Sequence, residues 1–205
     1  MKYIRAIPPT NPILKKQLLE EGFRPLKEPN NLITAILSSM PFMIVNVMLC
    51  YGFLHIINPQ AAASIHNLLT ASSWAFTIRF DYVIWLYALI VFHEVLHLVF
   101  IPNFLRSDDT FWGIKPWGGF VFTSQPLSKR RFLMVTLAPF VLLSIFLPAV
   151  LSVLGVLEGF ILFLILMNAA ASSVDVLNVF IIMTQVNKGS TLIQNGFETY
   201  TRSDK

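Results

Sequence analysis

The 205-residue sequence has little charge and almost no cysteine. Only 13% of its residues are charged, whereas a soluble globular domain carries about 25%. Such a chain cannot cover its surface with water-compatible side chains, which excludes an ordinary soluble domain, and its high hydrophobicity excludes a disordered chain. Cys50 is the single cysteine, so an internal disulfide scaffold is excluded as well.

Long apolar runs account for this composition, since 55% of the residues are hydrophobic and the mean hydropathy is +0.66. A bilayer core about 30 Å thick needs about 20 helical residues to cross it. Four stretches reach that length: Leu32 to Ile57, Tyr82 to Pro102, Phe132 to Gly155 and Gly159 to Met183. The sequence therefore predicts an all-α polytopic membrane protein with about four transmembrane helices.

The positive charges are sorted between the two sides of these spans. All but one of the 15 Lys and Arg residues lie before the first span, between the second and third, or after the fourth; the exception is Arg79. Because short basic loops stay in the cytoplasm, we expect a cell-membrane protein with both termini and the middle loop cytoplasmic. The net charge of +4 then needs no nucleic-acid partner, and the lipid bilayer is the expected environment.

The segments between the spans predict shorter elements. Residues Asn11 to Gly22 favour an amphipathic helix that lies on the membrane or packs on the middle loop, and residues 61–70 favour an interfacial helix. Aromatic and β-branched runs around glycines in Phe111 to Ser124 predict a small cytoplasmic β-hairpin between helices 2 and 3. It is either an interfacial turn anchored by Trp112 and Trp117 or an edge strand that pairs with an extended peptide.

The second span carries three ionisable side chains in the run V-F-H-E-V-L-H-L-V-F. On a helix, His93 and His97 share one face and can bind one metal ion, while Glu94 can reach a water bound to it. Zinc lowers the pKa of such a water toward about 7, and Glu94 would accept its proton during attack on a carbonyl. The alternative is a pair of interhelical hydrogen-bonding histidines beside a paired glutamate.

A catalytic zinc site usually needs a third protein ligand besides the two histidines. The candidates are Glu158, His55, Asp108, Asp109 and Asp175. The first two fall at the outer ends of their helices, and the next two lie in a polar loop. Spans two and four run in the same direction, which puts Asp175 at the depth of the histidines, with Asn168 on its face. The alternative for Asp175 is an interhelical polar network.

These residues together resemble a known family. The HEVLH on a membrane helix, the Gly-rich aromatic hairpin, S-K-R-R-F followed by L-A-P-F, and an Asp on a later span resemble the zincin peptidase family of small four-span bacterial membrane proteins, similar in layout to site-2 proteases. The resemblance covers about residues 80–185. It implies zinc held by His93, His97 and Asp175, with Glu94 as general base. One departure is V-D-V around the Asp, where site-2 proteases have L-D-G.

We therefore expect a zinc metallopeptidase that cleaves a membrane-protein or peptide substrate within or beside the membrane, with its active site open to the cytoplasm. Residues 1–31 would be a cytoplasmic segment, 32–185 the membrane-embedded metallopeptidase domain and 186–205 a cytoplasmic tail. Pro139 and Pro148 would kink the third span and open a path for water. The alternative is a non-hydrolytic metal-binding membrane scaffold, sensor or transporter component.

Overall fold

Four long apolar helices dominate the structure, a computed structural model that describes residues 1–72, 79–115 and 118–203. They cover Leu32–Ile57 (α2), Phe80–Phe100 (α4), Lys129–Val153 and Gly159–Gln185. Each is long and apolar enough to cross a membrane, within a few residues of the positions expected from the sequence. The chain is therefore a multi-pass membrane protein.

The third and fourth spans are each interrupted near their middle. The third consists of α5 (Lys129–Val141), a π-helical turn η1 (Leu142–Phe146) and α6 (Leu147–Val153). The fourth consists of α7 (Gly159–Ala171) and α8 (Ser173–Gln185), which meet at Ser172. Irregular backbone at bilayer depth is tolerated where protein covers it. The side chain of Ser172 is accordingly fully buried.

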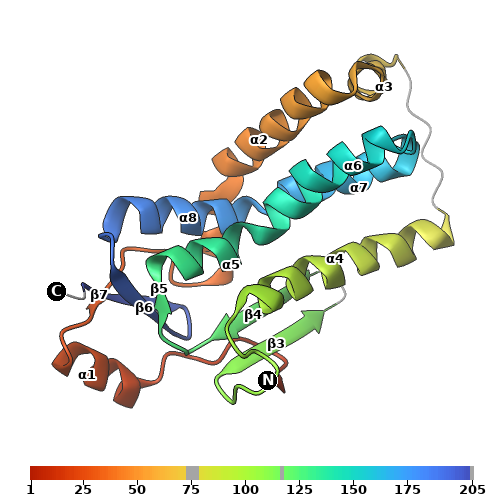
Figure 1. Ribbon diagram of the computed structural model, residues 1–205. Helices are drawn as coiled ribbons and strands as arrows, with labels where there is room; N and C mark the ends of the chain where they lie inside the picture. The colour runs from red at the N-terminus through yellow and green to blue at the C-terminus, as the bar shows by residue number, and fades with distance from the viewer. Residues whose placement is uncertain (73–78, 116–117, 204–205) are drawn as a thin grey trace.

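The third span joins the helices into one bundle. α2 packs along α7 and α8, while α5 packs on both α4 and α8 (Figure 1). The short helix α3 (Pro59–Thr70) begins after the cap residue Asn58 and matches the helix expected over residues 61–70. The main buried cluster joins α2, α3, α7 and the third span and contains Cys50, Leu54, Ala61, Ile65, Phe140, Leu157, Leu162, Ile165 and Ala169. This packing brings the end of α4 close to α8.

A three-stranded sheet combines two strands from the loop between the second and third spans with one strand from the N-terminus. Its strands are β1 (Lys2–Tyr3), β3 (Thr110–Lys115) and β4 (Gly118–Thr123), in the order β1-β3-β4. β1 is parallel to β3, and β3 is antiparallel to β4 over the segment where the sequence predicts a hairpin. Trp117, expected as a membrane anchor, lies outside the described residues. β4 is an edge strand in this strand order.

A second, four-stranded sheet corrects the all-α expectation. Its order is β2 (Arg24–Pro25), β7 (Glu198–Ser203), β6 (Ser190–Asn195) and β5 (Leu127–Ser128). Most of the segment expected as a tail thus forms the antiparallel pair β6–β7. The turn between them contains Gly196 at φ 64°, and the preceding Asn completes an Asn-Gly pair, which is a strong hairpin signal. The sequence therefore carried a signal for this hairpin that the expectation of a tail ignored.

The expected N-terminal helix is present as α1 (Pro12–Glu20), and it packs on a sheet formed near the C-terminus. Asn11 caps it, and Gly22 follows it at φ 84°. Its Leu18 packs with Phe23 and Tyr200 of β7, so the helix lies on the C-terminal sheet. Both sheets and α1 gather at the end of the bundle where α2 begins and where α4 and α8 end (Figure 1).

Candidate metal centre

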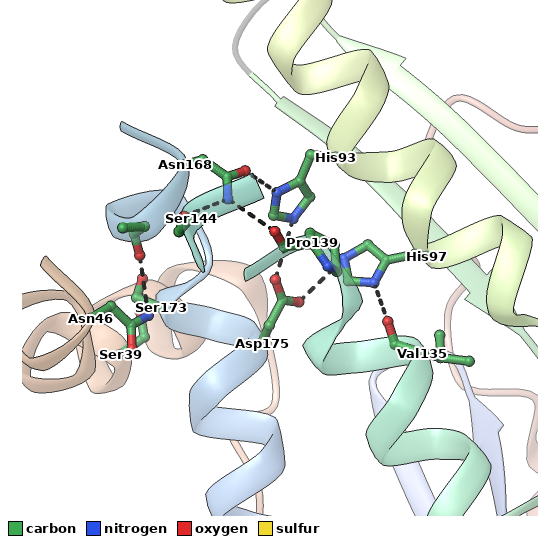
Figure 2. A network of polar contacts seen from close by, with 11 residues as sticks. Ser39, Asn46, His93, His97, Val135, Pro139, Ser144, Asn168, Ser173 and Asp175 are labelled. Carbon is green, nitrogen blue, oxygen red and sulfur yellow. Dashed lines mark hydrogen bonds and ion pairs between the residues drawn. The ribbon is translucent and has the colours of Figure 1, made fainter. Parts of the chain in front are cut away.

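Three side chains from two helices converge inside the bundle (Figure 2). His93 and His97 lie one turn apart on α4, so their rings share one helix face. Asp175 of α8 reaches both rings: its Oδ2 is 3.3 Å from His93 Nε2 and its Oδ1 is 3.5 Å from His97 Nε2. One ligand atom from each residue lies within 4.8 Å of the other two. The structure thus brings together the three residues that the sequence suggested as ligands.

The break in the fourth span positions Asp175. Because α7 ends before Ser172, Asp175 lies in the first turn of α8, where free backbone N–H groups favour a negative charge. Polar contacts between α2 and this span are made by other residues. Asn46 donates to the Ala169 carbonyl at 3.1 Å, and Ser39 and Ser173 pair at 3.1 Å. Asp175 is therefore not needed for the polar network between α2 and the fourth span.

The orientation of His93 is set by Asn168 of α7. The Asn168 amide group donates through Nδ2 to the Pro139 carbonyl at 3.2 Å and to Ser144 Oγ at 2.9 Å. With its nitrogen directed to those acceptors, its Oδ1 faces His93 Nδ1 at 2.9 Å. An amide oxygen only accepts hydrogen bonds, so Nδ1 of His93 carries a proton. In the neutral ring Nε2 then offers a lone pair toward Asp175.

The orientation of His97 is set by the main chain of α5. His97 Nδ1 lies 2.8 Å from the Val135 carbonyl oxygen, which can only accept. This nitrogen is therefore the protonated one in the neutral ring, and Nε2 again faces Asp175. The interhelical hydrogen bonds that formed the alternative interpretation of the histidines use one nitrogen of each ring. The other nitrogen of each ring, Nε2, faces Asp175.

The convergent donor set suits a metal cation. Two imidazole lone pairs and a carboxylate point at one another, and neutral rings in this arrangement repel the carboxylate unless a cation lies between them. Two nitrogen ligands and one oxygen ligand match catalytic zinc sites, which keep a further position for water. The side chains of His93 and Asp175 are only 12% and 16% exposed, so protein covers most of the cluster. The residues present therefore fit zinc.

Glu94 lies beside this cluster and against the first sheet. Its side chain is buried, with 8% of the residue exposed. Strand β4 approaches it so closely that a Cβ atom added to Gly119 would lie 2.3 Å from Glu94 Cγ. Only glycine leaves room for this approach. The arrangement holds a carboxyl group between the metal-binding helix and the edge strand of the sheet.

The other candidate ligands lie elsewhere. His55 in the last turn of α2 and Glu158 before α7 are at the opposite end of the bundle from the two sheets (Figure 1). Asp108 forms an exposed ion pair with Lys2 at 3.1 Å, and Asp109 lies in the same loop before β3. Within the part of the chain that the structure describes, the two histidines and Asp175 form the only cluster of three metal-ligating side chains.

The sequence analysis missed two groups that contact the site. The Ser144 hydroxyl accepts from Asn168, and the Val135 main-chain carbonyl accepts from His97. A main-chain acceptor cannot be identified from the residue type. One signal was nevertheless available, because Pro139 lies four residues after Val135 and lacks the N–H that normally occupies that carbonyl.

The comparisons with known proteins identify a family for the chain. No curated protein and no solved structure matches the chain. Residues 86–191, just over half of the chain, match the family described as "Putative zincin peptidase". The matched segment contains both histidines, Glu94 and Asp175, and the family description suggests a metallopeptidase with zinc as its cofactor. The chain therefore belongs to this zincin peptidase family.

Proposed function

We propose that the protein is a membrane-embedded zinc metallopeptidase that hydrolyses peptide bonds within or next to the membrane, in the manner of site-2 proteases. The observation that carries this proposal is the convergence of two imidazole nitrogens and one carboxylate beside a buried glutamate. His93, His97 and Asp175 would hold the metal. Family membership supports zinc as that metal.

Each residue then has a distinct role. Zinc at this site would lower the pKa of a bound water molecule toward about 7 and would act as a Lewis acid that polarises the substrate carbonyl. Glu94, adjacent to His93 but directed toward β4, accepts the proton of the attacking water and returns it to the leaving amine. Asn168 and the Val135 carbonyl hold the two rings in the tautomer that would bind metal through Nε2.

The substrate proposed for this site is an extended peptide segment of a membrane protein. β4 is the edge strand of the first sheet and contacts Glu94 through Gly119. An edge strand can pair with an extended chain by main-chain hydrogen bonds. A peptide added to β4 would run past the carboxyl group of Glu94, which supports the edge-strand interpretation of the hairpin.

The active site is proposed to open to the cytoplasm. Both sheets lie at the end of the bundle that carries the N-terminus, the middle loop and the C-terminal strands, which together hold all the Lys and Arg residues except Arg79. Positive loops of this kind stay cytoplasmic during insertion into the cell membrane. The metal site lies toward this same end, in the second half of α4.

The test compares metal content and hydrolysis in detergent-purified protein. Wild-type protein should contain about one zinc per chain, and His93→Ala should lose it. Glu94→Gln should keep its zinc while hydrolysis of single-span membrane peptides, followed by mass spectrometry, falls by about 10² to 10⁴. Glu158→Gln, which changes the same residue type far from the site, should behave as wild type.

Two outcomes would contradict the proposal. Equal cleavage by wild type and Glu94→Gln would eliminate Glu94 as the base. Stoichiometric zinc without cleavage of any peptide would favour the non-hydrolytic scaffold, sensor or transporter component instead.

A further inference from the structure

One proline, Pro139, is linked to both metal-site histidines through the groups that form hydrogen bonds with their rings. Pro139 lies inside α5 and is among the most completely buried side chains of the protein. A proline within a helix has no N–H to donate to the carbonyl four residues earlier. For Pro139 that carbonyl belongs to Val135, and it accepts instead from His97 Nδ1 at 2.8 Å. Because Pro139 has no N–H, the Val135 carbonyl remains available as an acceptor for the His97 ring.

The carbonyl group of the same proline acts on the other histidine. Pro139 O accepts from Asn168 Nδ2 at 3.2 Å, and Asn168 Oδ1 faces His93 Nδ1 at 2.9 Å (Figure 2). This hydrogen bond helps to fix which end of the amide faces the ring. If the amide were reversed, its NH₂ group would face His93 and its oxygen would face another oxygen acceptor at Pro139.

We propose that Pro139 is a positioning residue that fixes the tautomer and direction of both His93 and His97, so that both Nε2 atoms face Asp175. It acts on His97 through the Val135 carbonyl and on His93 through Asn168. The inference rests on the metal site of the proposed function, and it assigns the third span a task beyond opening a path for water.

Replacing this proline with alanine restores an N–H at position 139. That N–H competes with His97 for the Val135 carbonyl, because a regular helix directs it at this oxygen. His97 then loses the acceptor that keeps its proton on Nδ1, and the tautomer with a protonated Nε2 cannot bind metal through Nε2, the atom that faces Asp175. Losing the partner of a metal-binding histidine typically lowers metal affinity by about 10- to 100-fold.

The chain offers a matched control in the same span. Pro148 is also fully buried, and the carbonyl four residues before it is that of Ser144. This carbonyl accepts from Cys50 Sγ at 3.4 Å, a weak contact, whereas the contact of Ser144 with Asn168 is made by its hydroxyl group. Pro148→Ala therefore removes a proline ring from the same span without freeing or blocking an acceptor of His93 or His97.

The experiment measures zinc affinity by chelator competition on purified full-length protein in detergent, for wild type, Pro139→Ala and Pro148→Ala. Pro139→Ala should bind zinc about 10- to 100-fold more weakly, and Pro148→Ala should stay within about twofold of wild type. The Co²⁺-substituted proteins add a spectroscopic test. The visible absorption bands of Pro139→Ala should shift because the ligand field changes, while those of Pro148→Ala should match wild type.

A separate variant tests the contact to His93. Asn168→Leu keeps the approximate volume but removes the acceptor of His93, and it should also weaken zinc binding and shift the Co²⁺ bands. Melting of the metal-free proteins, measured in parallel, should show that the variants fold, since alanine suits a helix interior better than proline. A variant that melts like the wild type but binds zinc more weakly has lost the orientation of a ligand and not the fold.

The outcomes separate this inference from the function on which it rests. If wild type binds no zinc, both are wrong. If wild type binds zinc and Pro139→Ala matches Pro148→Ala in affinity and Co²⁺ spectrum, the metal site stands and Pro139 only shapes the helix. If Pro139→Ala does not fold, unchanged zinc affinity in Asn168→Leu would still overturn the inference.

Discussion

The contact between Gly119 and Glu94 gives a sharp prediction about the general base. In Gly119→Ala the new Cβ would lie 2.3 Å from Glu94 Cγ, 2.8 Å from Cδ and 2.9 Å from Oε1. Ordinary van der Waals contacts begin near 3.4 Å, so either the strand or the carboxyl group must move by about 1 Å. A misplacement of about 1 Å at a reacting group can cost about 10²-fold in rate.

We therefore expect Gly119→Ala to lose about 10²-fold in peptide hydrolysis while keeping its zinc, because the three atoms nearest to the new methyl group all belong to Glu94 and not to a proposed ligand. Gly118→Ala is the matched control, since a Cβ at that position meets nothing within 4 Å. Both variants are assayed for peptide cleavage and for metal content. Equal activity of the two variants would refute the role of this contact, and zinc loss in Gly119→Ala would show that the strand supports the metal site instead.

Two further predictions concern the third ligand and the orientation in the membrane. Asp175→Ala should lower zinc affinity by at least ~10-fold, measured by chelator competition, while Asp109→Ala in the loop before β3 should not; equal losses would exclude Asp175 as a ligand. In intact cells a membrane-impermeant maleimide should label Ser64→Cys but not Lys188→Cys, because the Lys and Arg distribution puts the C-terminal segment inside; the reverse pattern would invert the topology.

The sequence predicted the spans and the clustering of the candidate ligands because both follow from the cost of polar groups in lipid. A long apolar run has few possible structures other than a membrane span. Ionisable residues at bilayer depth, such as Glu94 and Asp175, are rare enough to suggest a functional site. Depth, together with the direction of the spans and the charge of the side chain, was enough to pair Asp175 with the histidines across about 80 residues of sequence. It could not give the distances, since these depend on the break at Ser172 that starts α8.

The second sheet could not be predicted to the same degree. β2 and β5 have two residues each, and Arg24–Pro25 has no strand pattern. These strands form only because β6 and β7 offer edges for them to pair with. The β6–β7 pair itself had a local signal in its Asn-Gly turn, but its importance appears only when α1 packs on Tyr200. Short strands of this kind are defined by tertiary pairing and not by local sequence.

A partly buried carboxyl group at the junction of this sheet and the bundle makes stability depend on pH. Glu28 lies between β2 and α2, outside the spans, and accepts a hydrogen bond from the Thr199 backbone N–H. Burial raises its pKa from 4.5 to about 7; the nearby Glu198 adds to this effect, and the bonds to Thr199 oppose it. The folded protein therefore holds a proton on Glu28 at pH values where the unfolded chain has released it.

The raised pKa of Glu28 in the folded protein sets the direction in which stability changes with pH. Between pH 4.5 and about 7 the folded state binds more protons than the unfolded state, so stability falls as the pH rises through this range. The loss approaches about 3 kcal/mol at most above pH 7, at about 1.4 kcal/mol per pKa unit. Glu28→Gln keeps an acceptor for Thr199 without a titrating group, so its melting temperature should fall less than that of wild type between pH 5 and pH 8.

The control for this measurement is Glu20→Gln, which changes an exposed glutamate on α1 whose ion pair with Lys16 is long, at 3.8 Å. A surface pair of this kind contributes little to stability, so this variant should follow the wild-type pH curve. Melting is recorded in one detergent at constant ionic strength, so that screening of the surface pairs does not change with pH. Parallel curves for wild type and Glu28→Gln would mean that Glu28 is ionised in the folded protein throughout this range, and that water reaches it despite the packing of Thr199.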